Sequence, residues 1–368
     1  MDREKQHKFT NSWIQQSEPY LIAGPCSAET EDQVIETARQ LVESNRPQLF
    51  RAGIWKPRTR PNSFEGVGEK GLPWLKRVKE EFGLPVTIEV ANADHVEKAL
   101  KYGIDVLWIG ARTTVSPFAV QEIAESLRGV DIPVMIKNPI NPDYALWVGA
   151  IERLLNTGNN KLAAIHRGFS SISSEYRNTP NWEIPIKLKT DFPDLKIICD
   201  PSHISGQRNK VFNVAQKALD LDFDGLMIET HISPDDAWSD AQQQITPQQL
   251  IETMSLLTVR SNTSKSTTFQ NQLEQLRSQI DEIDAEILKA LAKRKKIVGE
   301  IGSYKKDNDV TILQLERWRE ILDTRIPFGE GEGLDRQFVE LLLQLIHDES
   351  IKVQTDILNE RVIPDNKG

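Results

Sequence analysis

Arg51, Lys56 and Arg58 form a cluster of fixed positive charges directly after a short apolar run. A guanidinium presents a rigid fork of donors that matches carboxylate or phosphate oxygens, whereas an ammonium is a compact point charge. Together these three side chains could bind a small polyanion. A solvated basic loop is the competing interpretation, because charge runs commonly lie on the surface. Trp55 and the neighbouring prolines stiffen the segment and favour a shaped anion site.

Two larger sets of residues could do chemistry. The first could hold a metal ion, because it offers a thiolate, an imidazole and two carboxylates, a mixture that suits Mn, Fe, Zn or Co better than Mg or Ca; it is Cys26, His203, Glu229 and Asp240. Taken alone, Cys26 could equally be a buried core residue. The second set is cationic and predicts a substrate, or a pair of substrates, with several negative charges; it is Arg51, Lys56, Arg58, Arg112, Lys137 and Arg167.

Short β-rich runs alternate with helical stretches between residues 20 and 257, a pattern typical of a parallel sheet with crossover helices. Eight strands are predicted, at 20–23, 48–51, 85–90, 106–109, 133–137, 162–165, 196–199 and 225–228. Predicted helices include 31–45, 93–102, 209–221 and 247–257. Eight units over about 240 residues favour a (β/α)8 TIM barrel, an α/β fold, over a doubly wound open sheet.

The positions of the reactive residues also favour the barrel, because each follows or ends a predicted strand. Barrel enzymes build their sites from the C-terminal ends of several strands. In strand order these residues are Cys26, the Arg51–Arg58 cluster, Glu89, Arg112, Lys137, Arg167, Asp200 with His203, and Glu229. The sequence therefore predicts that they meet at one mouth.

Composition limits the class of protein. With 368 residues, two domains are expected. A formal charge of -9 argues against a nucleic-acid or membrane-surface partner. No apolar run approaches the roughly 20 residues that span a bilayer, and residues 1–17, expected to be an N-terminal extension, lack the apolar core of a signal peptide. We expect a cytoplasmic protein, in which two cysteines do not predict a disulfide framework.

Several ordered motifs between about residues 18 and 258 carry a family resemblance. They are Gly24-Pro25-Cys26-Ser27, Lys56-Pro57-Arg58-Thr59, Gly110-Ala111-Arg112-Thr113-Thr114, Met135-Ile136-Lys137-Asn138, His166-Arg167-Gly168, Asp200-Pro201-Ser202-His203 and Ile228-Glu229-Thr230-His231. The segment resembles 3-deoxy-D-arabino-heptulosonate 7-phosphate (DAHP) synthase, in its compact form. That family condenses phosphoenolpyruvate with erythrose 4-phosphate at the entrance of aromatic amino-acid biosynthesis.

The resemblance implies a role for each matched residue. Cys26, His203, Glu229 and Asp240 would bind one divalent metal ion. Glu89 would orient a water molecule, and Asp200 would lie in the substrate site. Arg58 and Thr59 would take the sugar phosphate, although Arg60-Pro61-Asn62 departs from the family pattern beside them. Phosphoenolpyruvate would be held by Arg51, Lys56, Arg112, Lys137 and Arg167. A sister family, 3-deoxy-manno-octulosonate 8-phosphate synthase, shares the barrel and is the alternative.

A Ser/Thr/Asn-rich stretch at residues 259–268 predicts a linker between a barrel at 18–258 and a second domain at 269–368. Apolar residues then recur at spacings of three and four, which predicts a helix from 269 to about 306. Shorter helices are predicted at 314–325 and 334–358. One helix of this length cannot bury its apolar stripe within so small a domain, so a homodimer is expected.

The second domain carries the series Leu273-x-x-Leu276-Arg277-x-x-Ile280-Asp281-x-x-Asp284, Leu291-x-x-Arg294, Lys305, Glu316 and Ser350-x-x-x-Gln354. This series resembles the all-α chorismate mutase family, whose three-helix fold is an intertwined dimer. The resemblance implies that Arg277 of one subunit and Arg294 of the other bind the two carboxylates of chorismate. Lys305 and Gln354 would donate to the ether oxygen, with Glu316 and Ser350 at the hydroxyl. Leu315 departs from the pattern, in which an Arg often precedes the Glu.

The two resemblances together predict a bifunctional enzyme of the shikimate pathway that makes DAHP and converts chorismate to prephenate. A non-catalytic regulatory or dimerisation module is the alternative for the second domain. Fusion of the two domains also suggests feedback control, in which the mutase ligand changes the synthase rate.

Overall fold

A computed structural model describes residues 8–14, 19–44, 47–57, 63–171, 175–261, 263–264 and 266–359. Arg58, Thr59 and the Arg60-Pro61-Asn62 departure lie outside the described residues. The chain forms two compact units, Met1–Asn262 and Thr263–Gly368, and each is described by itself.

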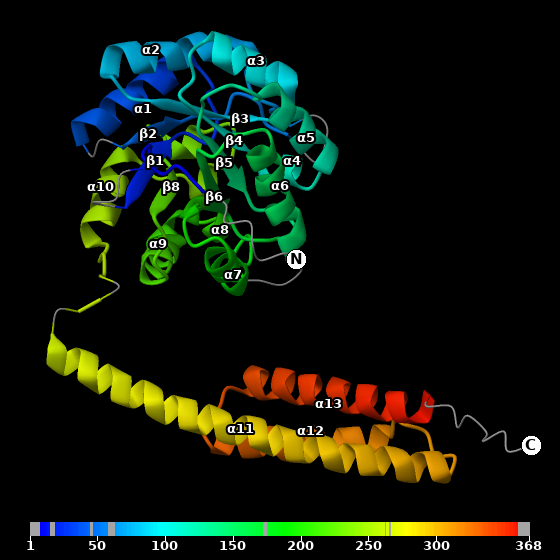
Figure 1. The fold of residues 1–368 in the computed structure, drawn as a ribbon. Coiled ribbons are helices and arrows are strands. Elements are labelled where there is room, and N and C mark those ends of the chain that lie inside the picture. The colour runs from blue at the N-terminus through cyan, green and yellow to red at the C-terminus, as the bar shows by residue number, and fades with distance from the viewer. Residues whose placement is uncertain are drawn as a thin grey trace, which may run out of the picture. The chain divides into compact units, whose positions relative to one another are not determined.

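The first unit is a closed barrel of eight parallel strands in sequence order, with β1 pairing β8 (Figure 1). The strands are β1 (Tyr20–Gly24), β2 (Leu49–Arg51), β3 (Val86–Val90), β4 (Val106–Ile109), β5 (Val134–Lys137), β6 (Leu162–His166), β7 (Lys196–Cys199) and β8 (Gly225–Glu229). Closure excludes the doubly wound sheet and confirms the predicted barrel. Each predicted strand is present, with its bounds shifted by at most one residue at either end.

Helices surround the strands (Figure 1). They are α1 (Glu31–Ser44), α2 (Leu72–Phe82), α3 (Ala93–Lys101), α4 (Ala111–Thr114), α5 (Pro117–Ser126), α6 (Tyr144–Asn156), α7 (Glu183–Asp191), α8 (Pro201–Ser205), α9 (Val211–Asp220) and α10 (Pro247–Leu256). Short 3-10 turns lie at Gly68–Gly71, Arg208–Lys210, Pro234–Asp236 and Ala241–Gln243. Side-chain caps fix several helix starts: the Asp143 carboxylate, for example, accepts a hydrogen bond from Leu146 N at 3.0 Å.

Two apolar layers hold the barrel together. One fills the space between strands and helices and includes Leu41, Phe50 and Ile151. The other fills the interior of the barrel and includes Ile22, Trp108 and Met135. Alternation along each strand divides its side chains between the two layers, so the polar residues at the strand ends project from a rigid base.

The second unit contains three helices, α11 (Thr267–Asp307), α12 (Leu315–Gly331) and α13 (Arg336–Asn359). At about 1.5 Å per residue, the 41 residues of α11 extend over roughly 60 Å. Within one chain, α13 contacts the C-terminal half of α11: Arg294 bonds to Ser350, and Lys306 bonds to Ile357 O at 2.8 Å. Figure 1 shows α12 and α13 alongside this half.

The prediction that the second helix ends at residue 325 was wrong, because α12 continues through Pro327 to Gly331. A proline inside a helix removes one backbone hydrogen bond. Packing on α13 offsets that loss: Ile326 is buried, and a Cβ on Gly329 would lie 2.6 Å from Val339 Cγ2, so the two helices meet closely there. None of the helices in the described ranges is both long and apolar enough to cross a membrane.

Candidate active site

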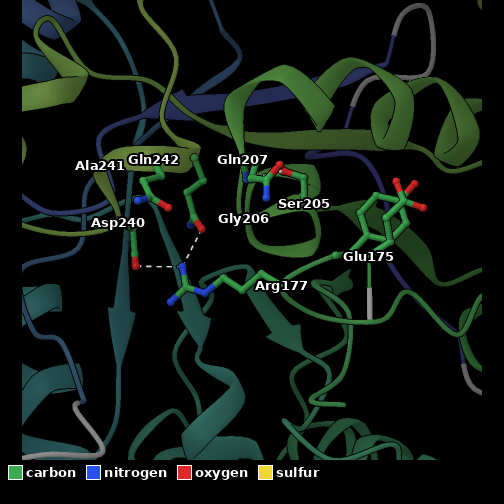
Figure 2. A pocket seen from close by; sticks show the side chains of 10 residues that line it. Glu175, Arg177, Ser205, Gly206, Gln207, Asp240, Ala241 and Gln242 are labelled. Atoms are coloured by element: carbon green, nitrogen blue, oxygen red, sulfur yellow. Dashed lines mark hydrogen bonds and ion pairs between the residues drawn. The ribbon is translucent and has the colours of Figure 1, made fainter. Parts of the chain in front are cut away.

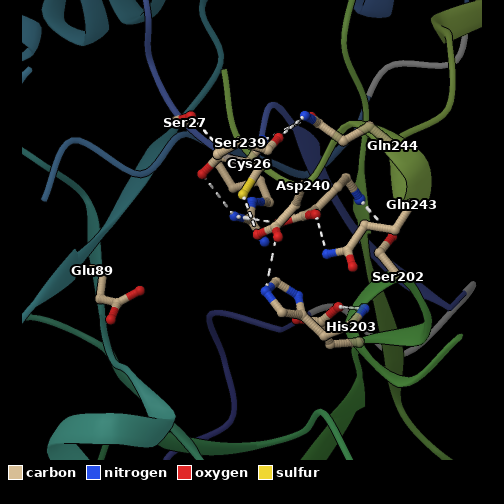
Figure 3. Close-up of polar contacts among 12 residues, drawn as sticks. Cys26, Ser27, Glu89, Ser202, His203, Ser239, Asp240, Gln243 and Gln244 are labelled. Carbon is tan, nitrogen blue, oxygen red and sulfur yellow. Dashed lines mark hydrogen bonds and ion pairs between the residues drawn. The ribbon is translucent and has the colours of Figure 1, made fainter. Parts of the chain in front are cut away.

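Cys26, Glu229 and Asp240 bring three potential metal-ligand atoms within 4.8 Å of one another at the mouth of the barrel. Figure 3 shows Cys26 and Asp240 side by side. Cys26 Sγ lies 3.1 Å from Asp240 Oδ2. His203 joins them from α8, with Nε2 3.7 Å from Glu229 Oε1. The four predicted ligands therefore converge, although they come from four separate segments of the chain.

The local backbone explains this convergence. Gly24 has φ +141°, and a Cβ there would fall 2.2 Å from Arg51 O, so only glycine lets β1 approach β2 closely just before Cys26. Asp240 adopts φ +50°, a left-handed conformation that Asp tolerates better than most residues. Gln244 Oε1 accepts a hydrogen bond from Cys26 N at 2.9 Å and ties the Asp240 segment to the first strand.

The donor set fits a divalent ion. Glu229 is fully buried, and its Oε1 lies 3.1 Å from Arg51 Nη2 without an aligned hydrogen-bond donor among the described residues. Burial, followed by the carboxylates of Glu229 and Asp240, raises the pKa of the Cys26 thiol to about 12. A cation between these groups would relieve both the carboxylate repulsion and the unmet acceptor, so the residues present suit a metal of the mixed-ligand class.

Asp200 links the metal set to the cationic set. Its Oδ2 accepts a hydrogen bond from Lys137 Nζ at 2.8 Å and lies 2.8 Å from His203 Nδ1. Burial opposes ionisation of Asp200, but His203 and Lys137 hold its pKa well below the usual value. Burial lowers the pKa of His203, with Lys137 acting in the same direction, which favours the neutral imidazole that binds metals.

Arg51 and Lys56 lie against the same cluster. Lys56 Nζ donates to Cys26 Sγ at 2.9 Å and to Cys26 O at 3.0 Å. The Arg51 guanidinium is 1% exposed, and its Nε and Nη1 have no acceptor among the described residues. It lies over the Trp108 ring at 5.1 Å, with Lys137 Nζ at 5.9 Å. Buried donors without acceptors are what an anion site presents before its ligand binds.

The remaining predicted residues of the barrel differ in their surroundings. Arg167 is buried, donates to Asn178 Oδ1 at 2.8 Å, and has its pKa lowered to about 10 chiefly by burial. Arg112 is exposed on α4. Glu89 accepts a hydrogen bond from Trp108 Nε1 at 3.2 Å, and Figure 3 shows it apart from the metal set. Its predicted role with water therefore stays a prediction.

The helical unit has a second pocket, a cavity of about 300 Å³ between α11 and α13. Arg294 Nη1 donates to Ser350 Oγ at 2.6 Å at this cavity. Next along α13, Gln354 is buried, and its Oε1 has no hydrogen-bond partner among the described residues. Lys305 Nζ donates to Ile312 O at 2.5 Å. Arg294 and Ser350 therefore meet within one chain.

Arg277 and Glu316 do not join this group. The Arg277 side chain is 63% exposed, and its guanidinium lies 3.9 Å from Glu274. Arg277 precedes Arg294 by seventeen positions on one helix, which separates them by about 25 Å at 1.5 Å per residue. Glu316 is exposed in the first turn of α12.

Comparison with known proteins decides the family. The sequence profile of the DAHP synthetase I family matches residues 10–265. The chain belongs to the DAHP synthetase I family. This confirms the resemblance carried by the barrel motifs.

Individual DAHP synthetase relatives are similar over the barrel. A phospho-2-dehydro-3-deoxyheptonate aldolase from Thermotoga maritima is 34% identical over 226 residues, which are 61% of this chain and 64% of that protein. The chain thus matches less than two thirds of that relative. A 2-dehydro-3-deoxyphosphooctonate aldolase from Geotalea daltonii is 29% identical over 61% of this chain and 86% of its own. A crystal structure of the Thermotoga DAHP synthase aligns with a TM-score of 0.60 at 30% identity, over 66% of this chain and 69% of that one.

The second unit matches a different family. The profile of chorismate mutase type II covers residues 276–355, in agreement with the resemblance drawn from the helical residues. This DAHP synthetase family member therefore carries the sequence signatures of two enzymes in one chain.

Sequence reasoning missed several residues at the mouth of the barrel. Trp108 contacts Arg51, Lys137 and Glu89, but an apolar strand residue gives no signal of that role. Gln243 donates to Glu229 Oε2 at 2.6 Å. Arg177 donates to Asp240 Oδ1 at 2.9 Å. Arg177 lies in an irregular loop and Gln243 ends the short 3-10 turn Ala241–Gln243, and neither segment has a repeating pattern that predicts a position.

Proposed function

We propose that the barrel condenses phosphoenolpyruvate with erythrose 4-phosphate to give DAHP. The observation that carries this proposal is the buried guanidinium of Arg51, whose unmet donors lie beside a mixed-ligand metal set. Family membership and the similarity to a Thermotoga aldolase of the same activity support the substrate class.

Cys26, His203, Glu229 and Asp240 would hold one divalent ion, with Mn, Fe, Zn and Co all compatible with the ligands. Such an ion would supply a Lewis acid for the aldehyde oxygen. Asp200 orients His203 through Nδ1 and holds Lys137 in position. The cations Arg51, Lys56, Lys137, Arg112 and Arg167 would bind the carboxylate and phosphate of phosphoenolpyruvate. Arg58 and Thr59 would bind the sugar phosphate.

In the proposed reaction one carbon–carbon bond forms and the C2–oxygen bond to phosphate breaks, with the protons of the added water going to the new hydroxyl and to phosphate. C3 of the enol attacks the aldehyde carbon, water adds to the cationic C2 centre, and phosphate then leaves. Fixed cations stabilise the negative charge of the phosphoenolpyruvate groups without moving during the reaction. Glu89 would orient the attacking water.

A 3-deoxy-manno-octulosonate 8-phosphate synthase, which takes arabinose 5-phosphate in place of erythrose 4-phosphate, is the second candidate, because a phosphooctonate aldolase is also similar over most of its length. The Lys56-Pro57-Arg58-Thr59 run favours the four-carbon sugar. Both aldoses should be assayed with phosphoenolpyruvate and metal. A clear preference for arabinose 5-phosphate would overturn the DAHP assignment.

We further propose that the helical unit converts chorismate to prephenate, a rearrangement that needs the compact conformer held and charge stabilised on the breaking ether oxygen. Arg294, Lys305 and Gln354 would act on the ether oxygen and one carboxylate. Glu316 and Ser350 would bind the hydroxyl side. The chorismate mutase type II match supports this reaction.

Arg277 would reach this site from a second subunit. It lies too far from Arg294 along α11 to serve the same site. The apolar stripe of α11 is exposed at Leu276, Ile280 and Ile283, each at least 50% exposed. A second copy that covers this stripe would form a homodimer and complete both sites.

Chorismate consumption by the whole chain tests the mutase, with Arg294→Ala as the inactive control. If the chain forms dimers but leaves chorismate unchanged, the helical unit would instead be a regulatory or dimerisation module.

Feedback is the remaining part of the proposal: chorismate or prephenate should change the synthase rate of the wild-type chain. The Arg294→Ala variant, which should not bind them, serves as the control. An equal effect on both chains would contradict control through the mutase site. A cytoplasmic location stays a prediction from the composition.

A further inference from the structure

Arg177 and Gln243 lie beside the metal set but belong to neither predicted set of site residues. Arg177 lines a cavity of about 530 Å³ at the barrel mouth together with Gly206, Asp240 and Gln243. Figure 2 shows its guanidinium directed at both Asp240 and a glutamine side chain. The Nη1–Oδ1 distance to Asp240 is 2.9 Å, and the Nη1–Oε1 distance to Gln243 is 2.6 Å.

The orientation of the Gln243 amide follows from these contacts. A guanidinium can only donate, so the amide oxygen of Gln243 must face Arg177. Its NH2 group then points the other way and donates to Glu229 Oε2 at 2.6 Å. Arg177 therefore contacts one predicted carboxylate ligand directly and a second through Gln243.

Each carboxylate is thereby left with one oxygen for an ion. Asp240 Oδ1 accepts a hydrogen bond from Arg177, while Asp240 Oδ2 lies 3.1 Å from Cys26 Sγ. Glu229 Oε2 accepts a hydrogen bond from Gln243, while Oε1 lies 3.7 Å from His203 Nε2 and 3.1 Å from Arg51 Nη2. Figure 3 shows the side chains of Cys26, His203, Asp240 and Gln243 gathered in one cluster. Arg177 and Gln243 thus determine which oxygen of each carboxylate points into the metal site.

Arg177 is itself anchored on the helix that carries His203. Arg177 N donates to Ser205 O at 3.3 Å, and Asn178 Nδ2 donates to His203 O at 2.6 Å. Gly206 ends α8 at φ +66°, and a Cβ there would lie 2.3 Å from Arg177 Cβ. The absence of a side chain at Gly206 lets Arg177 cross α8 and reach Asp240.

We propose that Arg177 and Gln243 are positioning residues that fix Glu229 and Asp240 as single-oxygen metal ligands and join their loop to α8. The inference rests on the proposed metal site. Partners that orient metal ligands typically contribute about 10–100-fold to metal affinity. Neither residue touches the reacting atoms, so their effect should fall on metal binding more than on turnover.

The test titrates Co²⁺ into chelator-treated full-length chain, with a competing chromophoric chelator to measure affinity and the cobalt–thiolate absorption band to report the Cys26 bond. Arg177→Met and Gln243→Met should each weaken Co²⁺ binding about 10–100-fold and shift the band. Arg177→Lys should restore part of the affinity. The double variant should lose less than the product of the single losses, because Arg177 acts partly through Gln243.

Arg208→Met is the matched control. Arg208 Nη2 donates to Ala241 O at 2.9 Å and to Asp235 Oδ1 at 2.8 Å in the same loop region, but among the described residues it makes no hydrogen bond to a predicted metal ligand. It should leave Co²⁺ affinity unchanged. Thermal unfolding of each metal-free variant checks that the barrel is intact.

Three results would overturn the inference. An unchanged Co²⁺ affinity in Arg177→Met would show that Asp240 does not need Arg177 to orient it. Equal losses in Arg177→Met and Arg208→Met would assign the effect to loop stability. If the wild-type chain binds no Co²⁺, the proposed metal site fails and the inference fails with it, a result distinct from the first two.

Discussion

The charged residues of the metal set in the barrel and their neighbours Arg51 and Asp200 are mostly buried and contact one another within one chain, whereas Arg277 and Glu316 of the helical unit are exposed and lie apart from Arg294. Arg51 and Glu229 have side-chain exposures of 1% and 0%, while Arg277 is 63% exposed. A barrel closes on itself, so its eight strand ends supply a whole site. The three helices leave the apolar stripe of α11 exposed, so the proposed mutase site would be completed by a second copy of the chain. On this proposal, one chain carries a self-sufficient barrel site and contributes to a shared mutase site.

The largest effect is expected from a variant that disables only the barrel site, which lies within one chain. Cys26→Ser should lower the synthase rate by roughly 1000-fold or more, because a bound Lewis acid contributes several kcal/mol to the transition state. Chorismate turnover by the same chain should be unchanged. Parallel assays of both reactions check this, and chelator treatment should reproduce the pattern. Synthase activity that survives Cys26→Ser would refute the metal assignment.

Complementation tests the shared site. Arg277→Ala and Arg294→Ala should each lower mutase activity by about 100-fold or more, since each removes a cation proposed to bind a carboxylate of chorismate. Unfolding and remixing the two in equal amounts should restore about a quarter of wild-type activity. Half of the dimers would be mixed, and each mixed dimer has one intact site. The chorismate rate before and after mixing measures this.

The same procedure applied to the barrel provides the control. A mixture of Cys26→Ser and Lys137→Met should regain no synthase activity, because each site uses one chain. Recovery of synthase activity in this mixture would contradict a barrel site that uses one chain. No recovery of mutase activity in the mixture of Arg277→Ala and Arg294→Ala would contradict the shared mutase site.

A smaller effect is expected from Asp200→Asn. The change removes the carboxylate that orients His203 and pairs with Lys137, and such partners contribute about 10–100-fold to metal affinity. Mutase activity should not change. Competitive Co²⁺ titration measures the loss, with Asp235→Asn on the exposed loop as control; equal losses in the two variants would contradict the assignment.

The smallest effect concerns acid stability of the barrel. Burial, and then Arg167, lowers the pKa of His166 to about 3, so the unfolded chain binds a proton near pH 6.5 that the folded barrel does not. This contribution is fully present above pH 6.5 and is lost as the pH falls toward 3, by up to about 1.4 kcal/mol per pH unit. His166→Gln should therefore weaken the decline in unfolding free energy between pH 7.5 and 5.

Urea unfolding followed by tryptophan fluorescence measures that decline. The signal reports mainly the barrel, because Trp318 is the only tryptophan after residue 262. His347→Gln on α13 is the control. An identical pH dependence in His166→Gln and wild type would refute the role of His166.

The sequence predicted the barrel and its mouth because physical constraints there are local. Buried strands are apolar runs, and residues such as Lys137 and Glu229 mark their ends. Arg177 and Gln243 could not be predicted, because loop conformation depends on contacts with α8 and Asp240 rather than on a repeating pattern. The end of α12 was missed for a related reason: the proline rule is local, whereas the packing of Gly329 on Val339 is not.

The length of α11 has a consequence for the amounts of the two activities in a cell. If half of this helix is covered only by a second copy, mutase sites form by mass action between chains, while synthase sites form with each chain. At concentrations below the dimer dissociation constant, mutase rate should then rise with the square of chain concentration and synthase rate in simple proportion. Measuring both rates over a dilution series tests this; a constant ratio of the two rates down to the lowest measurable concentration would rule out that dependence over the range.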